Sequence, residues 1–197
     1  MITSLCDKLT NLLLSKEVIK EEDSEIYNYG FQVLASNFAG FFIVFGVAIF
    51  TDSALVSTVY FLIFVVLRKI VGGYHAKTFI GCNLIFILIS MTVITLSNYF
   101  REFKIWHLLI CFLYSVLVLC FICPVENRNK PVDTKTKRKS RMVGLMFVIL
   151  AEFSSAFLLL SESKTVLVIA RTINISLVAV FTLAIAGYIK GKIGVVL

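Results

Sequence analysis

Residues 55–100 read LVSTVYFLIFVVLRKIVGGYHAKTFIGCNLIFILISMTVITLSNYF, two apolar runs on either side of a short polar segment. The polar segment, RKIVGGYHAKTFIGC at 68–82, contains three of the ten glycines of the chain together with one histidine and one cysteine. Each apolar run approaches the ~20 residues that an α-helix needs to cross ~30 Å of hydrocarbon. The pattern predicts two membrane helices joined where backbone freedom, positive charge and a thiol coincide.

The remainder of the 197-residue chain has the same character. It is 59% hydrophobic and 16% charged, with a mean hydropathy of +0.94, whereas a soluble domain has roughly 25% charged residues. The apolar runs are continuous and about twice as long as the ~10-residue strands of a membrane barrel. We therefore predict an all-α membrane protein with six transmembrane helices. The predicted spans are 31–50, 55–71, 79–100, 105–123, 142–160 and 166–189.

Lysines and arginines in the short connections predict the orientation of these spans. The connections after the second and fourth runs and the tail after the sixth are rich in cations, whereas the intervening connections hold few. Because cation-rich loops stay on the cytoplasmic side, we expect both termini and the 68–82 segment to be cytoplasmic. The expected location is a cell membrane, in a multi-pass arrangement.

The N-terminal region has a different pattern. Within residues 2–19 the apolar residues recur at intervals of three and four, which predicts an amphipathic helix too polar to span the membrane. It is expected to lie in the membrane interface, and packing against the membrane helices is an alternative. We predict one domain, in which 1–30 holds this helix and an acidic linker, 31–189 the six spans and 190–197 a basic tail.

A formal net charge of +7 favours anionic lipids and acidic partners over nucleic acid in so apolar a chain. The cations gather in the segment after the fourth run, which we interpret equally as a headgroup contact or as a docking site for an acidic peptide. The residues expected to carry docking are Lys130, Lys135, Lys137, Arg138 and Lys139. The five cysteines are expected to be reduced.

Cys82 and His75 are the residue types of thiol acyl-transfer chemistry, with Cys82 as nucleophile and His75 as base. The start of a helix, where Cys82 is expected, favours an anion. Seven residues apart on a straight helix, the two side chains would lie ~10.5 Å apart along the axis, too far for a hydrogen bond. We therefore expect Gly72, Gly73 and Gly81 to break the helix, so that a loop carries His75 back over Cys82.

Four other charged residues each allow two interpretations. Arg68 and Lys77 are candidates for binding a substrate carboxylate or an oxyanion, or are cytoplasmic anchors. Glu152 and Arg171 fall inside predicted spans, where a structural pair between them is one interpretation and a role in peptide passage another. A lone histidine and cysteine supply only half of a tetrahedral metal site, so no metal is expected.

The string GGYHAK followed by a cysteine seven residues after the histidine, together with CPVENRNKP at 123–131, resembles the AgrB (accessory gene regulator protein B) family. The resemblance extends over nearly the whole chain. It implies a cysteine endopeptidase of the bacterial cell membrane that needs no cofactor. Such an enzyme cleaves the C-terminal part from an AgrD propeptide and helps to close a thiolactone or lactone ring. The resemblance also implies His75 and Cys82 as catalytic residues, Arg68 and Gly73 as important ones, and a homodimer as the assembly to test.

Two other functions remain open from the residues themselves. The chain is alternatively a small membrane transporter or peptide exporter without proteolytic activity, or a noncatalytic scaffold. The clustering of histidine, cysteine and glycine at one expected cytoplasmic end argues against both. Transport sites usually lie nearer the middle of the membrane, on broken helices.

Overall fold

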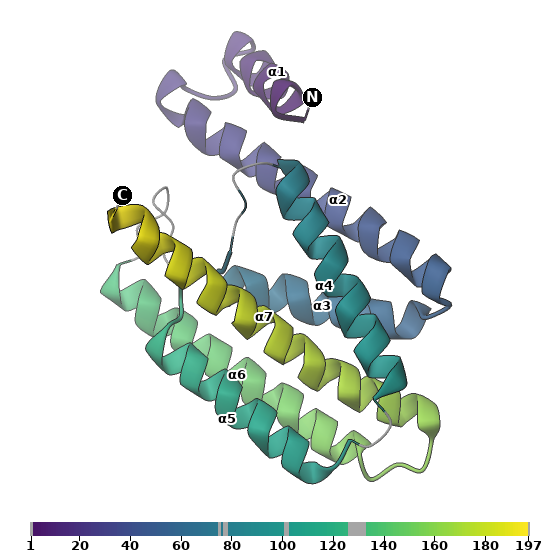
Figure 1. Ribbon diagram of the computed structural model, residues 1–197. Coiled ribbons are helices and arrows are strands. Elements are labelled where there is room, and N and C mark those ends of the chain that lie inside the picture. Colours follow the sequence, from purple (N-terminus) through teal and green to yellow (C-terminus); the bar gives the residue numbers. More distant parts are fainter. Residues whose placement is uncertain (1, 75, 77–78, 101–102, 126–132, 197) are drawn as a thin grey trace. The chain divides into compact units, whose positions relative to one another are not determined.

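The computed structural model describes residues 2–74, 76, 79–100, 103–125 and 133–196, and these residues form helices and connections without a strand (Figure 1). The chain divides into two compact units, Met1–Ile43 and Val44–Leu197, which are described separately. The elements are α1 (Ile2–Ser15), a 3-10 turn (Glu21–Asp23), α2 (Ser24–Thr51), α3 (Ala54–Val71), α4 (Phe79–Tyr99), α5 (Ile105–Phe121), α6 (Thr134–Leu158) and α7 (Lys164–Val196).

Each of the six predicted apolar runs corresponds to one helix, α2 to α7. Within the described ranges, four helices are long and apolar enough to cross a membrane: α3, α4, α6 and α7. The apolar part of α2 (Phe38–Thr51) and α5 are shorter than this. The all-helical membrane class is confirmed, and the number of spans stays a prediction.

Helix α7 is the centre of the second unit, since it packs against α3, α4, α5 and α6. Of its apolar window 56% is buried, against 22–33% in the other three long apolar helices. The core around it includes Leu67, Leu119, Val148, Leu177 and Phe181. Because α7 contacts four other helices, it is held on several sides, so segments that contact α7 are positioned by the core.

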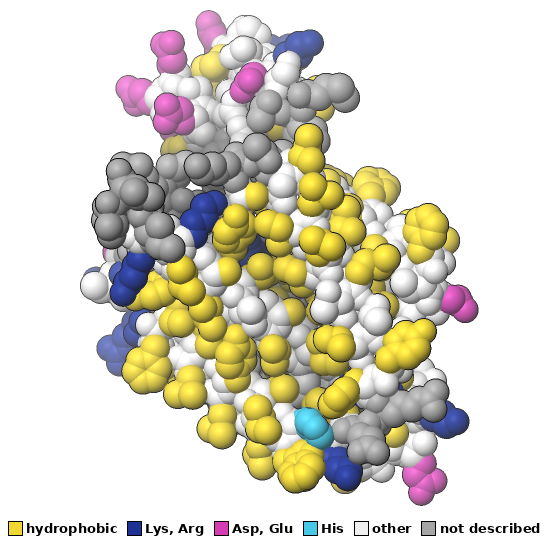
Figure 2. All heavy atoms as spheres, viewed as in Figure 1, with side chains coloured by type: hydrophobic (Ala, Val, Ile, Leu, Met, Phe, Trp, Pro, Cys, Tyr) yellow, Lys and Arg dark blue, Asp and Glu magenta, His cyan; other side chains and the backbone are white. Residues whose placement is uncertain are grey.

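The outer faces of the same helices remain apolar. On α5, Leu109, Leu113 and Leu117 follow one another at intervals of four and are all exposed. Figure 2 shows hydrophobic side chains over the middle of the visible face of these helices, with lysines and arginines nearer its edges. An apolar outer face of this kind suits hydrocarbon chains as its surroundings.

In the first unit, α1 confirms the predicted N-terminal helix but ends at Ser15, four residues before the predicted end. Leu5, Leu9 and Leu12 of its apolar face are exposed, whereas Cys6 is buried. The amide of Asn28 donates to the Asp7 carboxylate at 2.6 Å, which joins α1 to the start of α2. The exposed leucines leave an apolar face available for a lipid interface.

The basic segment before the fifth apolar run was expected to be a loop, but part of it is helical. Helix α6 begins at Thr134, eight residues before the predicted span. Asp133 caps the new helix start by accepting a hydrogen bond from the Thr136 backbone N–H at 2.6 Å. Hydrogen bonds from the Thr136 hydroxyl and backbone N–H lower the pKa of the Asp133 carboxyl. The Asp133 carboxylate satisfies an otherwise unpaired N–H and interacts favourably with the positive end of the helix dipole. A polar sequence can therefore extend the helix here.

Candidate active site

The helical path between α3 and α4 is interrupted at Gly72 and Gly73, as the sequence predicted. Helix α3 ends at Val71, and α4 begins at Phe79. Gly72 and Gly73 have φ angles of 75° and 139°, which L side chains rarely adopt. Gly81 was wrongly expected to help break the chain, because it lies inside the first turn of α4. The proposed base His75 and Lys77 lie outside the described residues.

Arg68, in the last turn of α3, holds the start of this connection. Its guanidinium donates to the carbonyl of Gly72 at 3.4 Å and to the carbonyl of Tyr74. A Cβ on Gly73 would collide with Nη1 of Arg68, so the guanidinium would have to move, and the φ of 139° strains any L side chain at this position. The two residues that the family resemblance singled out, Arg68 and Gly73, are thus in direct contact and shape one turn.

The far side of the turn is held by helix α7. The Tyr74 backbone N–H donates to the carbonyl of Leu183 at 2.9 Å. The ammonium of Lys190 lies 4.5 Å from the centre of the Tyr74 ring, within range of a cation–π interaction. Helices α3 and α7 therefore both fix the backbone immediately before His75.

The connection after α5 meets the same place. The Val125 backbone N–H donates to the carbonyl of Val71 at 2.9 Å, and the Arg141 Nε donates to the carbonyl of Cys123 at 2.8 Å. The two stretches that carry the family resemblance, around 72–77 and 123–131, thus begin side by side. The cation-rich connections also meet at one end of the helices, as their alternation along the chain predicted.

Cys82 lies in the first turn of α4 and is half-buried. The Arg68 guanidinium interacts electrostatically with Cys82 and with the Tyr60 hydroxyl. Cys123, which is near the same connection, is only 1% exposed and cannot meet a substrate without a rearrangement. All five cysteines are free, and Cys82 combines partial access with a neighbouring cation.

The predicted docking residues lie on the first turns of α6. Lys135, Arg138 and Lys139 are exposed, and Lys137 is half-buried. Lys130 lies outside the described residues. The exposed cations leave α6 able to contact an anionic headgroup or an acidic peptide, and both interpretations stay predictions.

The considered pair between Glu152 and Arg171 is not formed. Arg171 donates instead to the carbonyl of Phe100 and, at 3.3 Å, to that of Leu167. Neither carboxylate oxygen of Glu152 has a hydrogen-bond partner within the described part of the chain, although the side chain is only 5% exposed. Sequence placed the two residues at membrane depth, but their rotation about the helix axes points them to different neighbours.

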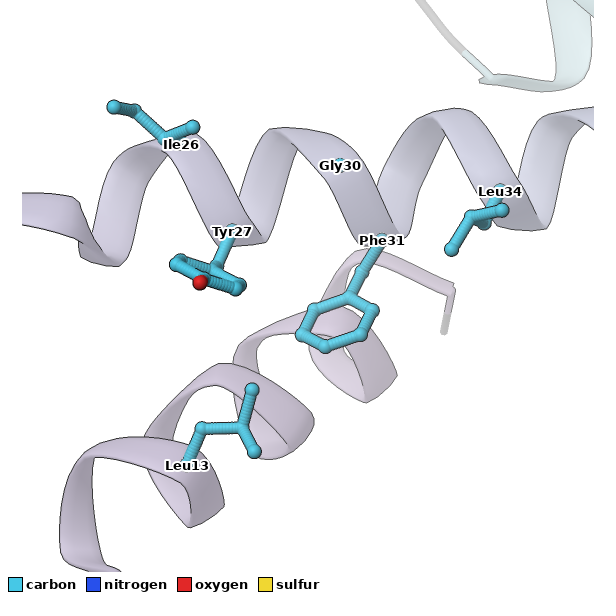
Figure 3. Close-up of a pocket in the computed structure, with 6 residues that line it drawn as sticks. All are labelled: Leu13, Ile26, Tyr27, Gly30, Phe31 and Leu34. Carbon is cyan, nitrogen blue, oxygen red and sulfur yellow. The ribbon is translucent and has the colours of Figure 1, made fainter. Parts of the chain in front are cut away.

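A separate apolar groove of about 480 Å³ lies within the first unit (Figure 3). Tyr27 and Phe31 of α2 project toward α1, and Leu13 projects from α1 toward them. The lining also includes Ile26, Gly30 and Leu34. It holds no nucleophile or base, so it is not a candidate for the chemistry at Cys82.

Sequence reasoning missed Leu183, Gly187 and Val125, which contact the turn from distant parts of the chain. The available signal was Gly187, since glycines in apolar membrane helices often mark a place where another backbone approaches closely. Among the residues that the structure describes, no three His, Cys, Asp or Glu side chains gather into a metal site.

Fold and site together define a helical membrane protein with a cysteine at the start of one long apolar helix, beside an arginine-held glycine turn. The family model for accessory gene regulator B matches residues 6–187, and the chain belongs to the AgrB family. Membership associates it with quorum sensing, with the membrane and with processing of an AgrD-like propeptide.

Similar proteins agree with this assignment. An AgrB-like protein of Clostridium perfringens strain SM101 is 24% identical over 155 residues, covering 76% of this chain and 72% of the relative. An AgrB-like protein of Listeria innocua is 25% identical over 178 residues, covering 87% and 85%. One from Clostridium beijerinckii is 26% identical over 144 residues, covering 73% and 69%. No solved structure matches the chain.

Proposed function

We propose that this chain is a membrane cysteine endopeptidase that cleaves the C-terminal part from an AgrD-like propeptide and promotes ring closure of the rest. The observation that carries the proposal is the half-buried Cys82 at the start of α4, within electrostatic range of the Arg68 guanidinium. Arg68 also holds the turn that leads to His75. One residue thus connects the proposed nucleophile with the backbone that precedes the proposed base.

The chemistry takes two acyl transfers. His75 accepts the Cys82 thiol proton as sulfur attacks a propeptide carbonyl carbon, and the collapsing tetrahedral adduct expels the C-terminal fragment as an amine, which takes the proton from His75. The N-terminal part remains as an acyl-thioester on Cys82. A thiol or hydroxyl within that same part then attacks the thioester, closes a thiolactone or lactone and returns the proton to Cys82.

Ring closure competes with hydrolysis of the thioester. A tethered nucleophile reaches a very high effective molarity, and partial exclusion of water slows the competing reaction. A half-buried Cys82 at a membrane helix end favours the tethered attack. The cation-rich end of the helices favours a cytoplasmic site with both termini cytoplasmic, and the exposed cations of α6 suit anionic lipids or an acidic part of the propeptide.

The test is cleavage of the cognate propeptide by the purified full chain in liposomes, followed by mass spectrometry. We expect a C-terminal fragment and a cyclic product from the wild type, and neither from Cys82→Ala or His75→Ala. Cys120→Ala is the matched control, since Cys120 is a free and exposed cysteine elsewhere. Cleavage that persists in Cys82→Ala would overturn the mechanism, cleavage that persists in His75→Ala would remove His75 as the base, and transport of uncleaved peptide would favour the exporter.

A further inference from the structure

One face of α7 supports the turn at Gly73 and Tyr74. Leu183, Gly187 and Lys190 are separated by four and three positions, which places them on the same side of a helix. Leu183 accepts the Tyr74 N–H, and Lys190 lies over the Tyr74 ring. Gly187 lies between them along the helix and touches the same backbone.

The contact at Gly187 is closer than any other residue type allows. A Cβ at this position would lie 2.5 Å from the Gly73 carbonyl carbon, 2.6 Å from the Tyr74 nitrogen and 2.9 Å from the Gly73 oxygen. All three atoms belong to the backbone, so no side-chain rotation can relieve the overlap. Addition of one methyl group must move the turn away from α7, or move α7 away from the core.

The packing of α7 opposes a movement of this helix away from the core. Ala184 and Phe181, which precede Gly187 on the helix, are fully buried against the neighbouring helices. The turn is held by Arg68 and by single hydrogen bonds, so it is the part that yields more readily. By contrast, a Cβ on Gly191, one turn further along α7, would meet nothing within 4 Å.

We propose that Gly187 is a positioning residue for the reaction at Cys82. Because it has no side chain, the Gly73–Tyr74 backbone can pack directly against α7, and this contact fixes the residue that precedes His75. The inference rests on the proposed function for its effect on catalysis. The structural part of the inference, that contacts with α7 hold the Gly73–Tyr74 turn in place, does not depend on any activity. Gly187 touches no substrate and acts only through the turn.

The first measurement is hydrogen exchange of the peptide that contains Gly73 and Tyr74, in the full chain in lipid nanodiscs. In Gly187→Ala, the Tyr74 N–H loses its bond to Leu183, and we expect its exchange to become at least about fivefold faster. Gly191→Ala is the matched control, with exchange at Tyr74 unchanged. Equal exchange at Tyr74 in the wild type and Gly187→Ala would overturn the proposal.

The second measurement separates positioning from folding. We expect Gly187→Ala to lower kcat for propeptide cleavage by about 100-fold, the effect of a displacement of about 1 Å in a catalytic group. KM and the thermal unfolding midpoint stay near those of Gly191→Ala. An unchanged kcat in a variant whose Tyr74 exchange has risen would show that the turn does not position the reaction, and would refute the proposal.

A variant that keeps Gly187 covers the case in which Gly187→Ala does not fold. Lys190→Met removes the cation over the Tyr74 ring, and Lys190→Arg retains one. We expect Lys190→Met to speed exchange at Tyr74 and to lower kcat, each about two- to fivefold, and Lys190→Arg to restore both. Identical behaviour of the two variants in exchange and kcat would contradict the seating on α7.

The two proposals fail separately. Absence of cleavage by the wild type would defeat the proposed function, and the exchange measurement would still decide whether α7 seats the turn. Normal cleavage by a folded Gly187→Ala would defeat the positioning role and leave the proposed function intact.

Discussion

Arg68→Gln is the substitution whose effect follows most directly from the site. It removes the two guanidinium N–H groups that donate hydrogen bonds to the Gly72 and Tyr74 carbonyls. A hydrogen bond from a charged donor contributes roughly 1.5–3 kcal/mol. The bond to Gly72, at 3.4 Å, is longer than the usual range and adds little. The turn therefore loses about 2–3 kcal/mol of stabilisation, most of it at Tyr74.

That loss converts into a rate. With 1.36 kcal/mol per tenfold, we expect kcat/KM for propeptide cleavage to fall roughly 30- to 150-fold in Arg68→Gln. Arg68→Lys keeps the charge but replaces the planar guanidinium by a single ammonium, so its kcat/KM should lie between those of the wild type and Arg68→Gln. Hydrogen exchange of the Gly73–Tyr74 peptide should rise in the same order as the loss of activity.

Lys69→Gln is the matched control. Lys69 is the neighbouring cation at the same helix end, and its side chain is exposed. Its removal changes the charge at this membrane surface by the same amount and leaves the turn intact, so we expect kcat/KM within about twofold of the wild type. Equal losses in Arg68→Gln and Lys69→Gln would refute the role of the turn and leave Arg68 as an anchor of membrane orientation.

Two further predictions concern α6. Glu152 is buried without a hydrogen-bond partner in the described ranges, so Glu152→Met should raise the free energy of unfolding by about 1–3 kcal/mol. Denaturant titration measures this change. Glu162 is exposed, so Glu162→Met is the control and should change the free energy of unfolding little. Because the pKa of Asp133 is lowered in the folded state, the stabilisation from its cap is fully present above the unfolded pKa of ~3.9 and is lost as pH falls through the lower folded pKa. The protection factor at the start of α6, which corrects the observed exchange rate for the slower intrinsic exchange in acid, should therefore fall on acidification. Asp133→Asn, which caps without titrating, should abolish that dependence.

Local features of the sequence predicted the local structure well. The apolar run at 55–71 matches α3 at Ala54–Val71, since hydrophobic length decides where a membrane helix can lie. The two adjacent glycines predicted the end of α3, because positive φ angles exclude most other residues. Gly81 shows the limit of that reasoning, since a glycine within a helical turn is tolerated and does not end it.

Contacts between distant segments were not predictable in the same way. The seating of Tyr74 on Leu183 joins residues 109 positions apart, counted from their numbers, and hydropathy carries no information about such a pair. The sequence allowed a pair between Glu152 and Arg171, which the structure does not form, because the position of a residue along a helix does not determine its rotation about the helix axis. The early start of α6 depended on one cap, Asp133, in a sequence that otherwise reads as a polar loop.

The central claim is that Cys82 is acylated by the propeptide. The most direct measurement incubates the full chain in liposomes with the cognate propeptide, quenches it in acid and maps the adduct by peptide mass spectrometry. We predict a hydroxylamine-sensitive adduct on Cys82, of the mass of the N-terminal part of the propeptide, formed together with an equal amount of C-terminal fragment. A C-terminal fragment released at the wild-type rate by Cys82→Ala, or an adduct on another cysteine, would contradict the account.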